Sequence, residues 1–311
     1  MTRSEYKGIH EKIKPYIHHT PVLTSQLLDE IAGCELFFKC ENFQKMGAFK
    51  MRGATNAILN LSDDQRSKGV VTHSSGNFAQ ALSLAARGLG VKAYIVMPDS
   101  APQVKIDAVR GYGGEVIMCP STLKDREETA NKIVSEKGAT FIHPSDDLDV
   151  IHGQGTATIE LLEEYPDIQA LVTPVGGGGL LGGTALAAHL FGNNVTVYAG
   201  EPEACDDAKR SLNSGVIESN ESANTIADGL KTMLGEFNFP IIQSYVSDIF
   251  LVSEQEILEA MKLIWTRLKI VCEPSSAVAF AAVLRNKEVF KGKKVGIIIS
   301  GGNVDLEKLP F

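Results

Sequence analysis

Short apolar runs alternate with longer amphipathic stretches over most of this chain. Residues 93–97 and 170–175, for example, are apolar runs of strand length. Residues 78–87 and 123–136 carry apolar side chains at helical spacing. Strands that alternate with helices in this way predict an α/β fold, in which crossover helices join parallel strands.

The same pattern predicts the remaining elements. We expect further strands at residues 35–40, 70–72, 115–118, 140–142, 195–198 and 295–299. We expect further helices at residues 4–17, 51–61, 102–109, 155–164, 180–190 and 206–213, and a short helix capped by Ser25. Ser253 and Glu256 have the spacing of a capping box, and apolar residues at helical spacing after them predict one more helix, up to Leu268.

The order of these elements predicts two units. The chain contains no low-complexity linker and no internal repeat. We expect a large α/β domain formed by residues 1–64 and 147–311, with a smaller α/β domain inserted at residues 65–146. A ligand should lie between the two domains, at the carboxyl ends of the strands.

Composition and charge argue against several classes of partner. The 311 residues carry a formal net charge of −8, whereas nucleic acids and anionic membranes attract basic patches. The five cysteines are scattered without a C-x-x-C pair, which indicates reduced thiols and no zinc site. The polar N-terminus and the lack of an apolar run of membrane-spanning length predict a cytoplasmic protein.

Lys50 is the first candidate for chemistry. It stands between Phe49 and Met51, where a predicted strand gives way to a predicted helix. A lysine held there against apolar groups loses hydration, which disfavours its ammonium form and frees an amine nucleophile. By itself, the pattern also fits an ordinary solvated lysine at the start of a helix.

Four consecutive glycines, Gly176, Gly177, Gly178 and Gly179, lie between a predicted strand and a predicted helix. Glycines let the backbone turn its amides towards a ligand, and the helix N-terminus adds a favourable dipole. A tight turn needs fewer glycines than this. The stretch therefore predicts a phosphate-binding loop.

A rival pattern overlaps this loop. Gly177, Gly179 and Gly182 match the dinucleotide-binding fingerprint, and Glu201 stands about 20 residues further on. An NAD-dependent oxidoreductase is therefore an alternative from a different class, although it leaves Lys50 without a role.

Residues 72–77 form a second polar turn between a strand and a helix. Ser74, Ser75 and Asn77 offer hydroxyl and amide groups beside free helix amides, which suit a carboxylate or a phenolic oxygen. Helix capping alone would also explain them. Two such turns and an activated lysine predict pyridoxal 5'-phosphate (PLP) joined to a small amino-acid substrate.

Two further groups of residues bear on cofactors. Ser300 follows the last predicted strand, and a neutral hydroxyl facing a pyridine nitrogen makes the ring a mild electron sink, suited to elimination or proton exchange. Glu201, Asp207 and the backbone carbonyl of Cys205 could bind a hard divalent cation, Mg²⁺ or else Ca²⁺ or Mn²⁺. The acidic residues could equally complement a helix N-terminus.

These motifs resemble those of fold-type II PLP-dependent enzymes, in the branch of serine racemases and serine/threonine dehydratases. The resemblance runs from Thr20 over nearly the whole chain and rests on residues 41–54, 74–77, 153–156, 176–179, 225–229, 273–275 and 300–305. It implies a fold like that of the tryptophan synthase β subunit, with two open α/β domains and the cofactor between them.

The resemblance also implies roles at the cofactor. Lys50 would carry PLP as a Schiff base, with Phe49 packed on the ring and Asn77 at its phenolic oxygen. Gly176 to Gly179 would hold the phosphate, and Ser300 would meet the pyridine nitrogen.

On the substrate side, the resemblance implies that Ser75 is a second acid/base on the ring face opposite Lys50. Proton removal on one face and return on the other inverts the α-carbon. The residues around the substrate would be Ser74, Ser75, Gly76, Asn77, Arg126 and Asp228. Glu201, Cys205 and Asp207 would bind the divalent cation. We also expect a homodimer, and a nucleotide effector at the subunit interface occurs in part of this branch.

Two positions depart from the resemblance. Phe78 stands where most relatives carry histidine, which removes a polar group near the cofactor. Ala48 stands where serine is usual, which removes a hydroxyl near the phosphate. Neither departure changes Lys50 or Ser75.

We therefore expect a PLP-dependent serine racemase that also eliminates serine to pyruvate and ammonia. A dehydratase (ammonia-lyase) of L-threonine, L-serine or threo-3-hydroxyaspartate would use the same bases, and the shape of the pocket decides between these substrates. The alternatives from other classes are the NAD-dependent oxidoreductase and a non-catalytic amino-acid sensor.

Overall fold

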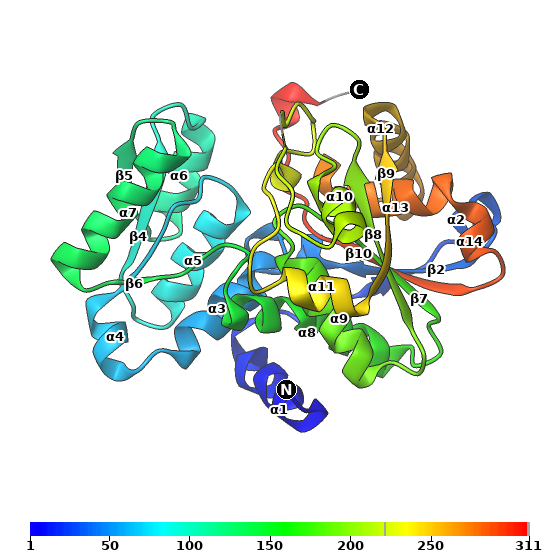
Figure 1. Cartoon of the computed structure of the whole chain (residues 1–311), viewed down its shortest axis with the longest axis horizontal. Coiled ribbons are helices and arrows are strands. Elements are labelled where there is room, and N and C mark those ends of the chain that lie inside the picture. The colour runs from blue at the N-terminus through cyan, green and yellow to red at the C-terminus, as the bar shows by residue number, and fades with distance from the viewer. Residues whose placement is uncertain (221, 310–311) are drawn as a thin grey trace.

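The computed structural model describes residues 1–220 and 222–309, and two sheets organise it (Figure 1). The larger sheet has six strands, and every neighbouring pair in it is parallel except the first. In sheet order these strands are β1 (Val22–Leu23), β2 (Glu35–Cys40), β10 (Lys294–Ile299), β7 (Ala170–Pro174), β8 (Thr196–Pro202) and β9 (Val246–Val252).

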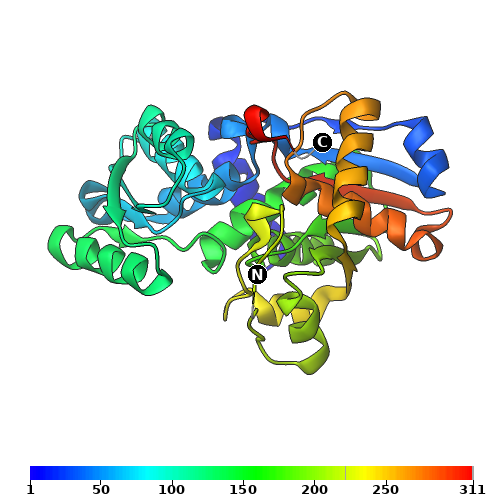
Figure 2. The same cartoon turned by 90° about the horizontal axis from the view of Figure 1, so that it is seen from above.

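The smaller sheet has four parallel strands. In sheet order they are β5 (Glu115–Cys119), β4 (Ala93–Pro98), β3 (Val70–Thr72) and β6 (Thr140–Phe141). We call this sheet, with its helices α5 (Asn77–Gly88), α6 (Gln103–Gly111) and α7 (Leu123–Lys137), the small lobe. The six-stranded sheet with its helices is the large lobe, and the two lobes lie side by side (Figure 2).

Helices cover both faces of the six-stranded sheet. One face packs against α2 (Gln26–Ala32), α12 (Glu254–Leu263) and α13 (Pro274–Arg285). The other face packs against α8 (Leu148–Glu164), α9 (Gly179–Phe191) and α11 (Phe239–Tyr245). The remaining helices are α1 (Arg3–Ile13), α3 (Lys50–Asn60), α4 (Asp63–Lys68), α10 (Asp207–Ser214) and α14 (Lys287–Phe290).

The central strands are apolar at successive positions because both faces are covered. In β10, Val295, Ile297 and Ile299 enter the core on one face, and Ile298 enters the core on the other. Successive side chains of a strand point to opposite faces, so a parallel sheet between two helical layers buries all of them.

Helix α3 connects the lobes. It packs against α8 of the large lobe and against α5 of the small lobe. Its residues Met51, Ala54 and Ile58 share a core with Leu82 of α5 and Val150 of α8. The position of the first residue of α3, which is Lys50, therefore depends on both lobes.

Most predicted elements are present, with shifted ends. The first helix ends at Ile13 and continues as a 3₁₀ turn, η1 (Lys14–Tyr16), because Pro15 has no amide hydrogen to donate. The helix predicted at 155–164 begins at Leu148, after Asp147 caps it. The capping box at Ser253 is confirmed, although the helix after it ends in a π-helical turn, η5 (Ile264–Leu268).

The sequence analysis assigned neither β9 nor α13. Residues 275–283 of α13 are all buried, so this helix has no polar face to mark a helical period. Strand β9 is an edge strand with polar Ser247 and Asp248 near its start, which interrupts its apolar run. In the described part of the chain, none of the helices combines the length and the apolar character needed to cross a membrane.

Candidate active site

Lys50 begins α3, next to the point where β2 and β10 end. Its Nζ atom donates a hydrogen bond of 2.6 Å to the backbone carbonyl of Pro144. The same atom lies 5.0 Å from the ring centre of Phe49 and 5.6 Å from that of Phe78. An amine with a single protein hydrogen bond between two aromatic rings is poorly hydrated.

Burial lowers the pKa of Lys50 to about 7. At neutral pH a large fraction of the side chain is therefore an uncharged amine. The uncharged amine is the form that a nucleophile or a base requires.

Residues 176–179 form the glycine loop. In the folded chain, Pro144 and Ser145 lie between this loop and Lys50. Pro144 contacts Lys50, and the next residue, Ser145, contacts the loop. A Cβ atom on Gly177 would lie 2.4 Å from the Ser145 hydroxyl oxygen, and one on Gly179 would lie 2.7 Å from the Ser145 carbonyl oxygen. Only glycine permits this approach, so the lysine and the loop belong to one site.

The glycine loop also needs its unusual backbone. Gly178 has a φ of +79° and caps α9, whose first amide groups face the loop without helical partners. A Cβ atom on Gly178 would lie 2.3 Å from the amide oxygen of Asn238, and one on Gly176 would lie 2.6 Å from the Cα atom of Leu230. The loop is thus an open helix N-terminus, which suits a phosphate.

Asn238 holds the glycine loop in place. Its Nδ2 atom donates to the carbonyl of Gly177 at 2.9 Å and to the carboxylate of Asp146 at 3.1 Å. Its Oδ1 atom accepts from the amide of Gly235 at 3.2 Å. The sequence analysis did not single out Asn238 or Asp146, because residues 92 positions apart show no local motif.

Ser300 is buried directly after β10. Its hydroxyl oxygen lies 2.9 Å from that of Ser276 on α13, and its carbonyl accepts from the amide of Phe49 at 3.0 Å. Ser276 in turn accepts from the amide of Gly301 at 2.7 Å. The last strand therefore ends in a pair of uncharged hydroxyls, tied to the segment that carries Lys50.

Asn77 begins α5 and bridges the two lobes. Its Nδ2 atom donates to both carboxylate oxygens of Glu273, at 3.0 and 3.2 Å, and its Oδ1 atom accepts from Nδ2 of Asn303 at 2.8 Å. One of the two Nδ2 hydrogens serves Glu273, so the other is available to a ligand oxygen.

Glu273 is a site residue to which the sequence analysis gave no role. It is buried, and burial raises the pKa of its carboxyl to about 7, against hydrogen bonds from Asn77 and the amide of Asn303. Its position before Pro274, at the start of a helix, was the available signal. Its contact with Asn77 required the fold.

The loop between β3 and α5 holds the remaining predicted serines. Ser74 accepts a hydrogen bond of 3.4 Å from the amide of Gly76. Ser75 is part-buried, and its hydroxyl forms no hydrogen bond with the described residues. Both lie within three residues of Asn77 and therefore at the edge of the same site.

Arg126 and Asp228 lie on different lobes. Arg126 is in the first turn of α7, and after burial its charge contributes to lowering the pKa of His73, so it lies near the β3–α5 loop. Asp228 begins the 3₁₀ turn η4 (Asp228–Leu230) and forms an ion pair of 2.8 Å with Lys105 of α6.

The two departures from the resemblance both lie at the site. Phe78 is buried and provides one of the two rings beside Lys50. Ala48 is buried and bridges to Gly301 at the end of β10. An apolar wall thus replaces the polar groups that histidine and serine would supply.

A buried charge network anchors the segment before and after Lys50. Arg52 donates to Glu41 at 2.7 and 2.9 Å and to Glu160 at 2.7 and 2.8 Å. Lys39 also contacts Glu160 at 2.7 Å. Burial opposes ionisation of Glu160, but Arg52 and Lys39 outweigh it and lower its pKa to about 2. We call these four residues the paired cluster.

Glu201 and Asp207 are also buried, but no cationic side chain forms an ion pair with them in the described structure. Glu201 lies near the end of β8, and its carboxylate accepts hydrogen bonds from the amides of Ala208 and Lys209 at 2.8 and 2.9 Å. Asp207 accepts from the side chain of Asn220 through Oδ1, whereas its Oδ2 has no hydrogen-bond partner among the described residues. Burial raises the pKa of Glu201 to about 8 and that of Asp207 to about 6.

This geometry bears on two predictions. Glu201 is 1% exposed and caps α10 with both oxygens, so it cannot bind a ribose as the dinucleotide fingerprint requires. No cluster of three His, Cys, Asp or Glu side chains with metal-binding geometry occurs in the described residues. A cation at Glu201 and Asp207 would therefore need backbone and water ligands as well.

The site fits PLP. The glycine loop offers free amides in a space that a Cβ atom would fill, Asn77 has a free donor, and Lys50 is an amine of low pKa. The acidic pair fits a hard cation, because the buried Oδ2 of Asp207 is an oxygen ligand without a partner.

Comparison with known proteins finds relatives over nearly the whole chain. Residues 13–301 match the family model of pyridoxal-phosphate dependent enzymes. The chain is 51% identical over 315 residues to a serine racemase of Dictyostelium discoideum, covering 99% of this chain and 97% of that protein. It is 49% identical to a β-hydroxyaspartate dehydratase of Paracoccus denitrificans, covering 100% and 98% of the two chains. A crystal structure of the Dictyostelium serine racemase superposes with a TM-score of 0.94 and 52% identity, covering 98% of this chain and 99% of that one.

Proposed function

The chain belongs to the pyridoxal-phosphate dependent enzyme family, and we propose that it interconverts L- and D-serine and also eliminates serine to pyruvate and ammonia. One observation carries this proposal. The Lys50 amine, with a pKa of about 7, contacts Pro144, and the next residue, Ser145, contacts a glycine loop that suits a phosphate. The 51% identity to a serine racemase over nearly the whole chain supports serine as the substrate.

In this proposal the residues of the site divide the binding of PLP among them. Gly176 to Gly179 would hold the phosphate, Asn77 would donate to the phenolic oxygen through Nδ2, and Ser300 would meet the pyridine nitrogen. Phe49 would pack on the ring. When bound, PLP supplies an electron sink that acidifies the α-hydrogen of an amino acid.

The chain's own residues then move protons. Lys50 takes the α-proton at Nζ, and Ser75 returns a proton from the opposite face through its hydroxyl, which inverts the α-carbon. Ser74, Gly76 and Arg126 bind and orient the substrate carboxylate. Phe78 excludes water from Lys50, which keeps the amine ready to accept a proton.

Elimination uses the same first proton transfer. If the protonated Lys50 donates its proton to the β-hydroxyl instead, water leaves, and hydrolysis of the product gives pyruvate and ammonia. The chain thus needs no additional base for the second reaction.

A dehydratase of threo-3-hydroxyaspartate, L-threonine or L-serine is the second candidate. The 49% identity to a β-hydroxyaspartate dehydratase supports it. Activity on a dicarboxylic substrate would require a second cation at the site, beyond Arg126.

We also propose that Glu201, Asp207 and the carbonyl of Cys205 bind Mg²⁺ (or Ca²⁺ or Mn²⁺), with water completing the shell. A hollow of about 570 Å³ borders Asn220, the partner of Asp207, and gives a hydrated cation an approach. The protein is further proposed to be a cytoplasmic homodimer with the small domain at residues 65–146. A nucleotide effector at the subunit interface is a proposal that rests on the resemblance alone.

The test is a substrate panel of L-serine, D-serine, L-threonine and the 3-hydroxyaspartates, scored for keto acid and for chirality. We expect D-serine and pyruvate from L-serine. Detection of neither product would overturn the proposal. Keto acid formed from 3-hydroxyaspartate alone would favour the second candidate. Lys50→Ala should abolish both activities and the visible absorbance of lysine-bound PLP, whereas Lys45→Ala, in the same segment, should retain them.

A further inference from the structure

An ion pair joins the two lobes. Nζ of Lys105, on α6 of the small lobe, lies 2.8 Å from Oδ2 of Asp228, on η4 of the large lobe. Among the residues that the structure describes, no second ion pair connects these two lobes. The pair links parts of the chain that are 123 residues apart.

On the large lobe, the pair is coupled to the glycine loop. Asp228 and Leu230 belong to the same 3₁₀ turn, and a Cβ atom on Gly176 would lie 2.6 Å from the Cα atom of Leu230. The amide of Gly229, between them, donates to the hydroxyl of Ser275 at 3.0 Å. Because this packing is so close, a shift of Asp228 would displace the loop.

On the small lobe, the pair is coupled to the second acid/base. Lys105 lies on α6, which packs against α5, the helix that begins at Asn77 two residues after Ser75. After the larger effect of burial, Asp228 raises and Lys105 lowers the pKa of Glu273, the partner of Asn77. Both charges are therefore close to the site.

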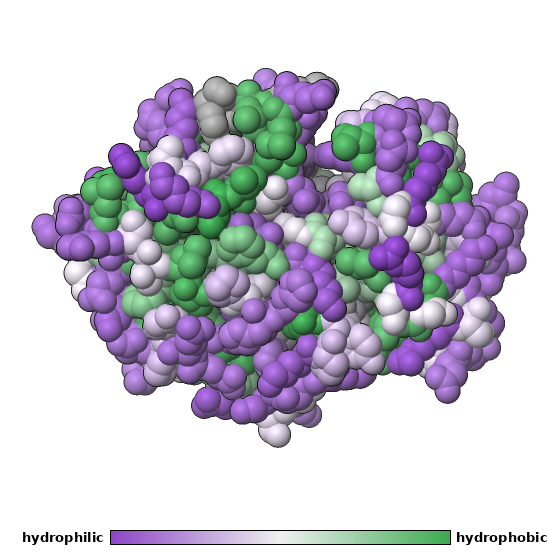
Figure 3. All heavy atoms as spheres, turned by 180° about the vertical axis from the view of Figure 1, so that it is seen from behind, coloured by the Kyte–Doolittle hydropathy of each residue, from purple (hydrophilic) through white to green (hydrophobic). Residues whose placement is uncertain are grey.

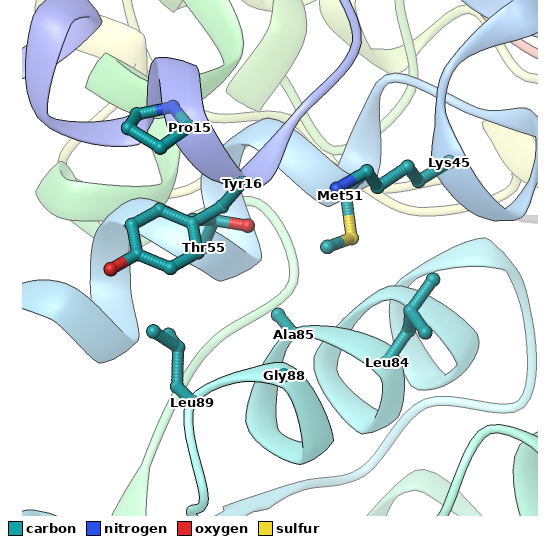
Figure 4. A pocket seen from close by; sticks show the side chains of 9 residues that line it. All are labelled: Pro15, Tyr16, Lys45, Met51, Thr55, Leu84, Ala85, Gly88 and Leu89. Atoms are coloured by element: carbon teal, nitrogen blue, oxygen red, sulfur yellow. The ribbon is translucent and has the colours of Figure 1, made fainter.

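An open hollow borders the contact between α3 and the small lobe. A cavity of about 210 Å³ lies between α3 and α5, where Met51 and Thr55 face Leu84, Ala85 and Leu89 (Figure 4). Seen from behind, a notch at the upper edge of the molecule separates the large lobe from the small lobe (Figure 3).

We propose that Lys105 and Asp228 are a positioning pair, which holds the small lobe over the cofactor site so that Ser75 faces Lys50. The inference rests on the proposed function for its catalytic consequence. Its structural part, that the pair sets the arrangement of the lobes, is independent of the substrate. Neither side chain takes a proton from the substrate.

The expected signature differs from that of a stabilising contact. The side chains of Lys105 and Asp228 are 35% and 56% exposed, and exposed ion pairs contribute little to folding stability. Loss of the pair should therefore leave the melting temperature almost unchanged. It should instead raise KM, because part of the binding free energy of the substrate must then bring the lobes together.

The experiment compares Lys105→Met, Asp228→Asn and the charge reversal Lys105→Asp with Asp228→Lys in the holoenzyme. The matched control is Lys92→Met, which breaks an exposed 2.7 Å ion pair with Glu115 inside the small lobe. We expect each single variant to raise KM for L-serine about 5- to 10-fold. Lys105→Met, which the resemblance does not place at the substrate, should keep kcat and cofactor absorbance within about 2-fold. The reversal should restore KM to within about 3-fold of the wild type, and the control should match the wild type.

Hydrogen exchange of the ligand-free holoenzyme gives a reading that does not depend on turnover. Amides of both α6 and η4 should exchange faster in Lys105→Met and not in Lys92→Met. Single variants that match the control in KM and in exchange would overturn the inference, as would a reversal that restores nothing. An inactive wild type with faster exchange in Lys105→Met would reject the proposed function and retain the structural part.

Discussion

Two groups of buried carboxylates in the large lobe differ in what neutralises them. In the paired cluster, Glu41 and Glu160 are 0% and 3% exposed and contact Arg52, with Lys39 as a second cation for Glu160. Glu201 and Asp207 are each 1% exposed and have no ion pair in the described structure. All four side chains are buried carboxylates, so only their partners distinguish the two groups.

The difference appears in the pKa values. The cations lower the pKa of Glu160 to about 2, whereas burial raises that of Glu201 to about 8. A buried carboxylate that is paired with a cationic side chain has its charge neutralised. Here such pairs hold the segment around Lys50 in place. A buried carboxylate without one is stable only as the neutral acid or with a cation from solution, and that makes it a candidate ligand site.

The largest effect should come from breaking the paired cluster. Glu160→Gln leaves Arg52 and Lys39 buried with too little negative charge, so we expect a loss of about 3 to 5 kcal/mol in the free energy of unfolding. Denaturant unfolding of the apoprotein measures it. A loss below about 1 kcal/mol would show that the cluster does not depend on its charge balance.

A divalent cation should have the next largest effect. Mg²⁺ at 100 times its Kd should stabilise the wild type by about 2.7 kcal/mol, because it binds only the folded state. Melting temperatures with Mg²⁺ and with chelator measure this, and Asp207→Asn should remove the shift. Equal melting temperatures under both conditions would reduce Glu201 and Asp207 to helix-capping acids.

Glu273 resembles Glu201 and Asp207, since it is buried and has hydrogen bonds but no ion pair in the described structure. Its pKa is raised from 4.5 to about 7, so its contribution to stability is complete below about pH 4.5 and is lost as pH rises through about 7. We expect a loss of about 1 to 3 kcal/mol between pH 5 and pH 8. Glu160 has the opposite sign: its contribution is lost as pH falls towards about 2.

The Glu273→Gln variant isolates this contribution. Lys50, with its lowered pKa, contributes stability that rises with pH above about 7, in wild type and variant alike. The difference between their stability profiles should therefore follow Glu273 alone. Parallel profiles from pH 5 to pH 8 would contradict the prediction.

The smallest effect should come from Glu201→Gln in chelated protein. Glu201 leaves no cation behind, but Gln keeps only one acceptor for the two backbone amides, so we expect a loss of about 1 kcal/mol in the free energy of unfolding. The same substitution at Glu160 is the matched control, and similar losses at both positions would erase the comparison.

The sequence by itself determined most of the elements and made Lys50 and the glycine loop candidates for the site. Continuous apolar strands, helical periods and four glycines at a strand-to-helix junction are local patterns, so they identified the α/β class, Lys50 and the glycine loop. The edge strand β9 and α13, whose residues 275–283 are all buried, escaped because their patterns lack a clear period.

Only the tertiary structure decided which charges are neutralised. Arg52 is 108 residues from Glu160, Asn77 is 196 from Glu273, and Lys105 is 123 from Asp228. A pKa depends on burial and on nearby charges, and neither is fixed by neighbours in sequence. The local sequence pattern thus made Lys50 and Glu201 candidates. Folding placed Lys50 against an apolar wall and left Glu201 without a cationic partner.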